Sequence, residues 1–239
     1  AAEPFAVSSG LGILSVARAA RDDGVKVLLS GDCADELFGG YSWYSHLEQL
    51  RIKNRKAQFH DSELSFQDIG RPLNEKIEAM QNYSPQRKAW ALHYYASERE
   101  KRSLFSESFF GAVSSSLRHF DDLKSGGDVK PIEFIRHDRR FYLRNEMLRK
   151  LDRMTMRYSV EGRVPFAARS VVKLAARIPY SQLVTSNSLK YLLRGAFEHQ
   201  LPENIIKRPK HGFNIPIDHW LKTQWADMVE DTFGPSSRL

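Results

Sequence analysis

One short segment of this chain has the pattern of a β-strand, and most of the chain after it has the pattern of helix. The apolar run at residues 25–29 follows Gly24, which ends a helical pattern over residues 11–21. A continuous apolar run of this kind predicts a short, mostly buried strand of the parallel type. One such strand forms no sheet by itself. We therefore expect an α/β parent fold to which this chain contributes mainly helices and one parallel-type strand.

The remaining helical patterns end near prolines, which stop a helix or begin a new one. The predicted helices cover residues 73–81, 85–101, 131–158, 169–178, 186–199 and 217–232. Residues 51–72 are polar and irregular, and Ser125–Asp128 has the composition of a loop. No internal repeat or low-complexity tract divides the chain. Residues 1–239 are therefore expected to belong to one partial domain.

Composition excludes several classes of protein. Lys plus Arg number 36 and Asp plus Glu number 29, which gives a net charge of 36 − 29 = +7. The charge is spread along the chain, so it suits an ordinary basic surface as well as a nucleic-acid or polyphosphate ligand. The single cysteine excludes an internal disulfide framework and a cysteine-rich zinc site. No apolar run approaches the roughly 18 residues of a membrane span, and the first residues lack a signal-peptide layout, so we expect a cytoplasmic protein.

The strongest functional signal is the segment Ser30–Tyr41, which has the sequence Ser-Gly-Asp-Cys-Ala-Asp-Glu-Leu-Phe-Gly-Gly-Tyr. It begins where the strand ends, and open α/β sheets bind ligands at that edge. The small residues Ser30 and Gly31 let backbone amides approach a phosphate or a ribose closely.

The same segment carries three carboxylates in five positions. Asp32, Asp35 and Glu36 would repel one another unless a cation lies between them. A Mg²⁺ ion held by one or two carboxylates and by substrate phosphates would meet that need. The alternative is a solvated acidic turn at the positive end of the next helix.

Three segments in a fixed order resemble the C-terminal synthetase domain of the asparagine synthetase family, which is of the ATP pyrophosphatase type. Residues 30–41 are similar to the family's second nucleotide motif. Residues 144–166 resemble its central helix and its Glu-x-Arg-x-Pro-Phe turn. Residues 188–213 are the third segment, in which 188–194 resemble the family's lysine segment and 207–213 its terminal basic loop. The resemblance covers nearly the whole chain and implies an adenine nucleotide alpha hydrolase-like parent fold.

The resemblance implies an amide ligase that uses ATP and Mg²⁺ and forms AMP. A carboxylate such as that of aspartate attacks the α-phosphorus, pyrophosphate leaves, and ammonia or another amine converts the acyl-adenylate to an amide. Such a site needs positive charge where the leaving group develops its negative charge. The implied roles are catalysis by Asp32 and Lys190, ATP binding by Ser30, Gly31 and Asp32, pyrophosphate binding by Lys190, Arg208 and Lys210, metal binding by Asp35, and substrate binding by Asp152.

The chain departs from the family pattern in three places. Residues 1–239 contain neither the glutamine-hydrolysing domain with its cysteine nucleophile nor the Ser-Gly-Gly-x-Asp-Ser pyrophosphate loop, which residues 8–12 resemble only superficially. We therefore expect an N-terminally truncated fragment, one subunit of a split enzyme or a degenerate relative, with a glutaminase and pyrophosphate-loop half on a longer or separate chain. Cys33 occupies a position where the family often has Gly, and a packed small residue is favoured there over a nucleophile.

Other functions remain open at this point. A relative that closes β-lactam rings or cyclises peptides would keep the fold, and a non-catalytic interaction module would keep part of it. A nucleic-acid partner is not expected, because no recognised binding motif accompanies the charge. A lone parallel strand leaves an unpaired edge, so the isolated chain is expected to form homo-oligomers, aggregate or need a partner. Without the missing motifs, we expect this chain alone neither to hydrolyse glutamine nor to form AMP.

Overall fold

The computed structural model describes residues 7–48, 75, 77–78, 80, 83–92, 98–123, 129–185, 188–210, 212–213, 215–235 and 237. The irregular segment 51–72 and the loop at Ser125–Asp128 lie outside these residues. Of the helix predicted over 73–81, Glu75, Ile77 and Glu78 are helical. The chain divides into two compact units. The first comprises Ala1–Ser30, Glu146–Pro165 and His211–Leu239, and the second comprises Gly31–Asn145 and Phe166–Lys210.

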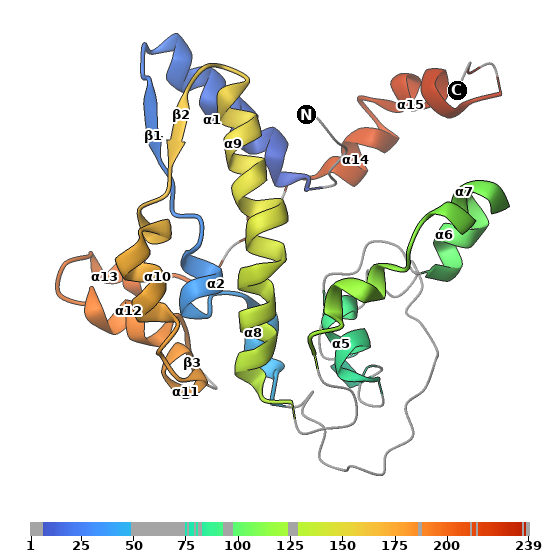
Figure 1. Cartoon of the computed structure of the whole chain (residues 1–239). Coiled ribbons are helices and arrows are strands. Elements are labelled where there is room, and N and C mark those ends of the chain that lie inside the picture. The colour runs from blue at the N-terminus through green and yellow to red at the C-terminus, as the bar shows by residue number, and fades with distance from the viewer. Residues whose placement is uncertain are drawn as a thin grey trace. The chain divides into compact units, whose positions relative to one another are not determined.

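The first unit is built on two helices and a two-stranded sheet. Helix α1 (Ser9–Asp22) packs against α9 (Leu148–Met156), and strand β1 (Val27–Leu29) lies beside β2 (Glu161–Arg163) (Figure 1). The strands are parallel, with Leu28 opposite Gly162. Ala17, Leu151 and Val160 are at most 5% exposed and form the core. Helices α14 (Ile217–Lys222) and α15 (Ala226–Phe233) complete the unit.

The sheet confirms a parallel-type strand and corrects two expectations about it. The sequence predicted no partner, yet β2 pairs with β1 through the Glu-Gly-Arg of the expected turn. The prediction of a mostly buried strand was also wrong, because Val27 is 37% exposed and Leu29 is 75% exposed. A parallel strand is buried when other strands and helices cover it. Among the described residues, β2 is the only strand that pairs with β1.

The second unit is mostly helical and contains a short antiparallel pair of strands. Its core is formed by Leu37, Tyr44, Phe134, Ile135 and Leu183, all at most 2% exposed. Its elements are α2 (Ala34–Phe38), η1 (Ser42–His46), α5 (Pro85–Leu92), α6 (Glu98–Leu104), α7 (Glu107–Ala112), η2 (Ser116–Phe120), α8 (Pro131–Arg140), α10 (Arg169–Ala175), α11 (Tyr180–Leu183), β3 (Val184–Thr185), β4 (Ser188–Leu189), α12 (Tyr191–Ala196) and α13 (Glu203–Ile206). The short 3-10 turn η4 (Pro165–Ala167) precedes α10.

Two predicted helices are interrupted in the structure. The helix expected over 131–158 contains a π-helical turn, η3 (Leu143–Met147), between α8 and α9. A π-turn inserts one extra residue into a helix and is often found at functional sites. The helix expected over 217–232 breaks at Thr223, whose backbone is not helical, and continues as α15.

The largest correction concerns residues 186–199, which were expected to be one helix. Ser188 and Leu189 instead form β4, which pairs with β3 in antiparallel register. Lys190 then adopts a left-handed backbone conformation with φ 53°, and α12 begins only at Tyr191. Pairing with Val184 and Thr185 therefore overrides the helical pattern of this segment. No helix in the described part of the chain is long and apolar enough to cross a membrane.

Candidate functional site

Helix α2 is held between two residues with positive φ angles. Cys33 precedes it with φ 72°, and Gly39 ends it with φ 75°. Gly39 is suited to this left-handed C-cap because it has no Cβ. The Gly39 carbonyl then accepts a hydrogen bond of 3.0 Å from the Lys190 N–H. The end of the Ser30–Tyr41 motif therefore fixes the backbone of Lys190, 151 residues farther along the chain.

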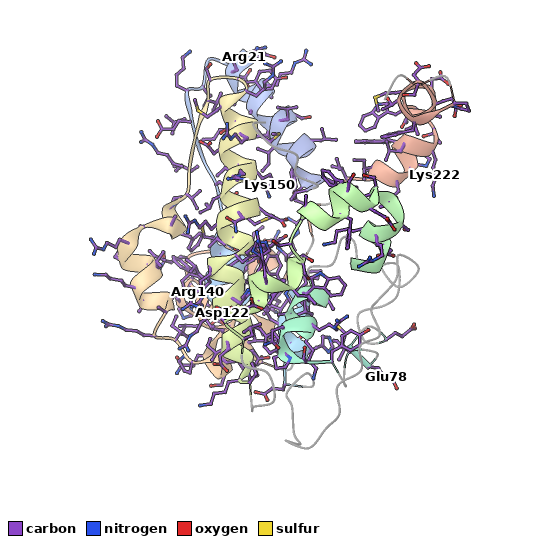
Figure 2. The ribbon with its side chains drawn as sticks, turned by 45° about the vertical axis from the view of Figure 1, so that its right-hand side comes forward. Arg21, Glu78, Asp122, Arg140, Lys150 and Lys222 are labelled. Atoms are coloured by element: carbon purple, nitrogen blue, oxygen red, sulfur yellow. The ribbon has the colours of Figure 1, made fainter. Side chains whose placement is uncertain are left out.

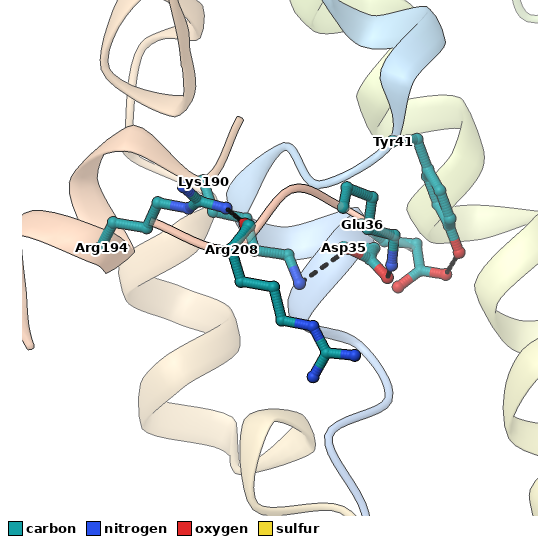
Figure 3. A network of polar contacts seen from close by, with 7 residues as sticks. Asp35, Glu36, Tyr41, Lys190, Arg194 and Arg208 are labelled. Carbon is teal, nitrogen blue, oxygen red and sulfur yellow. Dashed lines mark hydrogen bonds and ion pairs between the residues drawn. The ribbon is translucent and has the colours of Figure 1, made fainter. Parts of the chain in front are cut away.

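Two lysines meet on the carboxylate of Asp35 in α2. Lys190 Nζ lies 2.7 Å from Asp35 Oδ1, and Lys210 Nζ donates to Asp35 Oδ2 at 2.8 Å (Figure 3). The side chains of Asp35, Lys190 and Lys210 are 21%, 25% and 33% exposed. Burial raises the pKa of Asp35, but the two ammonium groups outweigh it and bring the pKa below its usual 3.8. The cluster of Asp35, Lys190 and Lys210 therefore carries a net charge of +1 at neutral pH.

Gly40 leaves room for this cluster. A Cβ atom at position 40 would lie 1.8 Å from Asp35 Oδ1 and 2.3 Å from Lys190 Cε. Both distances are far shorter than a van der Waals contact, so the Asp35–Lys190 ion pair occupies the space that any other residue's side chain would fill. Glycine at position 40 is therefore needed to leave space for the ion pair, whereas glycine at position 39 suits a left-handed backbone conformation.

Glu36, the next residue of α2, is anchored in the interior. It is 1% exposed, and its carboxylate accepts a hydrogen bond of 2.6 Å from the Tyr41 hydroxyl (Figure 3). Burial raises the pKa of Glu36 above its usual value. Arg139 of α8 donates to the carbonyls of Glu36 and Leu37, at 2.9 Å each. These bonds satisfy carbonyls at the end of α2, so Arg139 is a positioning residue that the sequence did not single out.

Arg194 of α12 is a second positioning residue that was missed. Its guanidinium donates to the Arg208 carbonyl at 2.8 Å (Figure 3). It also donates to the Ile206 carbonyl at 2.8 Å. These bonds fix the backbone just before Lys210, whose side chain reaches Asp35. The signal was present in the Lys-x-x-Leu-Arg pattern of residues 190–194, where Arg194 lies four residues after Lys190.

The other predicted site residues lie near or outside this cluster. Asp32 is partly buried in the turn before α2, and Gly31 is exposed, with no atom within 4 Å of the position of a Cβ. The Arg208 side chain is exposed. Ser30, whose N–H donates to the Arg163 carbonyl at 2.8 Å, and Asp152, which is exposed on α9, belong to the first unit rather than to the unit that holds the cluster.

Cys33 has the properties of a packed residue. It is 2% exposed, and burial together with the charges of Glu36 and Asp32 raises the pKa of its thiol to about 12. A thiol with so high a pKa is almost wholly protonated at neutral pH and is a poor nucleophile. These observations favour Cys33 as a packed core residue over Cys33 as a nucleophile.

The described residues do not form a metal site by themselves. No group of three or more His, Cys, Asp or Glu side chains in the described part of the chain could hold a metal ion. Both oxygens of Asp35 already contact a lysine nitrogen, and a dication there would be repelled by both ammonium groups. The cluster fits a phosphate better than a bare metal ion, and the assignment of Mg²⁺ to Asp35 stays a prediction.

Comparison with known proteins identifies the family. The family model described as asparagine synthase matches residues 1–238. The chain belongs to the asparagine synthase family. This confirms the family that the three sequence motifs indicated.

Curated relatives agree with the asparagine synthase assignment. The chain is 32% identical over 235 residues to a protein of Mycobacterium bovis named putative asparagine synthetase [glutamine-hydrolyzing]. It is 29% identical over 245 residues to asparagine synthetase [glutamine-hydrolyzing] 1 of Bacillus subtilis. These matches cover 94% and 96% of this chain but 35% and 37% of the relatives, so the chain spans about a third of their length. No solved structure matches it.

Proposed function

We propose that this chain is the phosphate-binding part of an AMP-forming amide ligase that converts aspartate to asparagine with ATP and ammonia. The proposal is supported by membership of the asparagine synthase family and by the names of the relatives. The observation that carries it is the pair of ammonium groups, from Lys190 and Lys210, held on the single carboxylate of Asp35. Two closely held cations in a partly buried site suit a ligand with several negative charges.

In the proposed reaction, the Asp35 carboxylate holds the ammonium groups of both lysines close together before ATP binds. Phosphate oxygens then compete with the carboxylate for the same ammonium protons. As the aspartate carboxylate attacks the α-phosphorus, negative charge develops on the departing pyrophosphate, and Lys190 and Lys210 stabilise it. The Arg208 guanidinium adds a third cation two residues before Lys210. The Mg²⁺ that accompanies ATP would supply further charge neutralisation. Asp35 would be free to hold it only once phosphate oxygens have replaced its carboxylate as the partner of Lys190 and Lys210.

Asp32 is the proposed group beside the acyl-adenylate, where a carboxylate would orient ammonia or accept its proton. Ser30 and Gly31 are proposed to face the nucleotide through their backbone. Asp152 is proposed to help bind the aspartate substrate. A glutaminase and pyrophosphate-loop half is the proposed source of ammonia and of further phosphate contacts, because the named relatives are glutamine-hydrolysing and much longer.

The test measures AMP, pyrophosphate and asparagine formed from ATP, aspartate and ammonia by this chain expressed with its neighbouring coding sequence. We expect equal amounts of AMP and asparagine, with turnover reduced by about 10²-fold in Lys190→Ala and in Lys210→Ala. Lys173→Ala is the matched control, because Lys173 is an exposed lysine of α10 in the same unit. Formation of ADP instead of AMP would contradict the proposal, as would wild-type turnover in both site variants.

A further inference from the structure

A cavity of about 520 Å³ lies in the second unit between α8 and the segment that joins α10 to α11. Lys130, Pro131 and Arg136 line one side, and Arg177 and Tyr180 line the other. None of these residues belongs to the Asp35 cluster. The volume is within the range of roughly 300–1,000 Å³ that is typical of small-molecule sites.

The lining of this cavity is strongly basic. It includes three cations, Lys130, Arg136 and Arg177, and one carboxylate, Glu48, which gives a net charge of 3 − 1 = +2. Among the described residues, none of the three cations forms an ion pair. The nearby carboxylate of Glu133 instead accepts a hydrogen bond of 2.9 Å from the Lys130 backbone N–H. Within the described part of the chain, the cavity therefore presents more positive charge than its one lining carboxylate balances.

Tyr44 connects the two sides of the cavity through the protein interior. The Tyr180 hydroxyl donates to the Tyr44 carbonyl at 2.5 Å, and the Tyr44 hydroxyl donates to Asp138 Oδ2 on α8 at 2.7 Å. Tyr44 is fully buried, and Asp138 is 4% exposed. These two bonds fix the spacing between the cationic sides, so a ligand would not have to assemble the cavity when it binds.

We propose that this cavity binds a small ligand that carries two or more negative charges, such as a phosphorylated or polycarboxylate metabolite. Arg136 and Arg177 provide planar guanidinium groups that bind phosphate or carboxylate through paired hydrogen bonds. Lys130 adds a third positive charge at the N-cap of α8, where the helix dipole is also positive. This site is separate from the cluster proposed to hold ATP, and its existence does not depend on the proposed reaction.

Titration calorimetry with tripolyphosphate and with citrate tests the proposal. The starting protein is the full chain carrying Lys190→Ala, Arg208→Ala and Lys210→Ala, which removes the three cations proposed for the other site. We expect one molecule of probe to bind per chain. Adding Arg136→Gln and Arg177→Gln is expected to weaken this binding by about tenfold or more. Both arginines are exposed, so the fold should be retained, and circular dichroism checks it.

The matched control replaces Arg140 and Arg169 with Gln. These exposed arginines belong to α8 and α10, so the net charge changes equally, but they do not line the cavity. Arg140 pairs with Asp122 at 2.9 Å (Figure 2). We expect the control to change the affinity by less than about twofold. An equal loss of affinity in both double variants would show that the probes are attracted to the basic surface in general, and it would overturn the proposal. The proposal would also be overturned if neither tripolyphosphate nor citrate bound. The stronger of the two probes identifies the preferred anion.

Discussion

Asp35 and Glu36 are consecutive residues of α2 whose carboxylates lie in opposite environments. Asp35 contacts the ammonium groups of Lys190 and Lys210, whereas Glu36 is buried against the Tyr41 hydroxyl. The pKa of Asp35 is lowered because the lysines outweigh its burial, and the pKa of Glu36 is raised because burial dominates. Two chemically similar neighbours therefore have opposite electrostatic effects on the stability of the fold.

Replacing Asp35 with Asn tests the ion pairs. A carboxyl with a lowered folded-state pKa stabilises the fold above its unfolded pKa, and this stabilisation is lost as the pH falls through the folded value. We expect Asp35→Asn to lower the free energy of unfolding by about 1–2 kcal/mol at neutral pH. The difference from the wild type should begin to shrink as the pH falls below about 4 and should disappear only below the lowered folded-state pKa of Asp35. Urea unfolding at several pH values measures it, and a difference that does not change with pH would contradict the ion-pair assignment.

Replacing Glu36 with Gln should have the opposite effect on the free energy of unfolding. Because the folded-state pKa of Glu36 is raised, its contribution is most favourable at low pH and is lost as the pH rises through that value. Gln keeps an acceptor for Tyr41 without a buried charge. We expect the free energy of unfolding of Glu36→Gln to rise by about 1 kcal/mol relative to that of the wild type as the pH rises from 4 to 8. Glu36→Ala, which leaves the Tyr41 hydroxyl without its acceptor, should be destabilised at every pH in the same unfolding series.

Gly40→Ala should displace the Asp35–Lys190 ion pair while leaving most of the fold intact. The nearest atoms to the added methyl group belong to the Asp35 and Lys190 side chains, which must move away, so we expect a loss of about 1–3 kcal/mol in stability. The pKa of Asp35, measured by carbon NMR of its carboxyl group, should rise towards 3.8. Gly195→Ala in α12 is the control, because no atom lies within 4 Å of its added Cβ. An unchanged Asp35 pKa in Gly40→Ala would refute the steric argument.

Cys33→Gly should be tolerated. Glycine removes a left-handed strain of about 1–2 kcal/mol at φ 72° and loses the packing of a small buried thiol, so we expect stability within about 1 kcal/mol of the wild type. Cys33→Val places a β-branched residue at the same backbone angle and should be destabilised by at least about 2 kcal/mol. Thermal unfolding of the two variants in parallel decides the point, and equal stability would argue against strain at this turn.

The sequence predicted those parts of the fold that depend on local patterns. The apolar spacing of residues 11–21 correctly indicated α1, and the apolar run at residues 25–29 correctly indicated the parallel strand β1. The family resemblance also pointed to Asp35, Lys190 and Lys210 as site residues. The structure brings these three together, and it is untested whether they perform the predicted roles.

Features set by tertiary contacts were not predictable in the same way. The strand β2 consists of Glu-Gly-Arg, which has no apolar signal because its neighbours in the sheet, rather than its own side chains, define it. The left-handed backbone of Lys190 depends on β4 and on the Gly39 carbonyl. The contact between Lys210 and Asp35 joins residues 175 positions apart, which no local pattern specifies.

Arg139 and Arg194 share a property that bears on how this site can evolve. Each donates hydrogen bonds to main-chain carbonyl oxygens. Arg139 bonds those of Glu36 and Leu37, and Arg194 bonds those of Ile206 and Arg208. A hydrogen bond to a backbone carbonyl does not depend on which side chain the accepting residue carries. Mutation can therefore exchange the side chain at position 208 while the loop that delivers Lys210 stays in place, so ligand preference can drift without a loss of architecture.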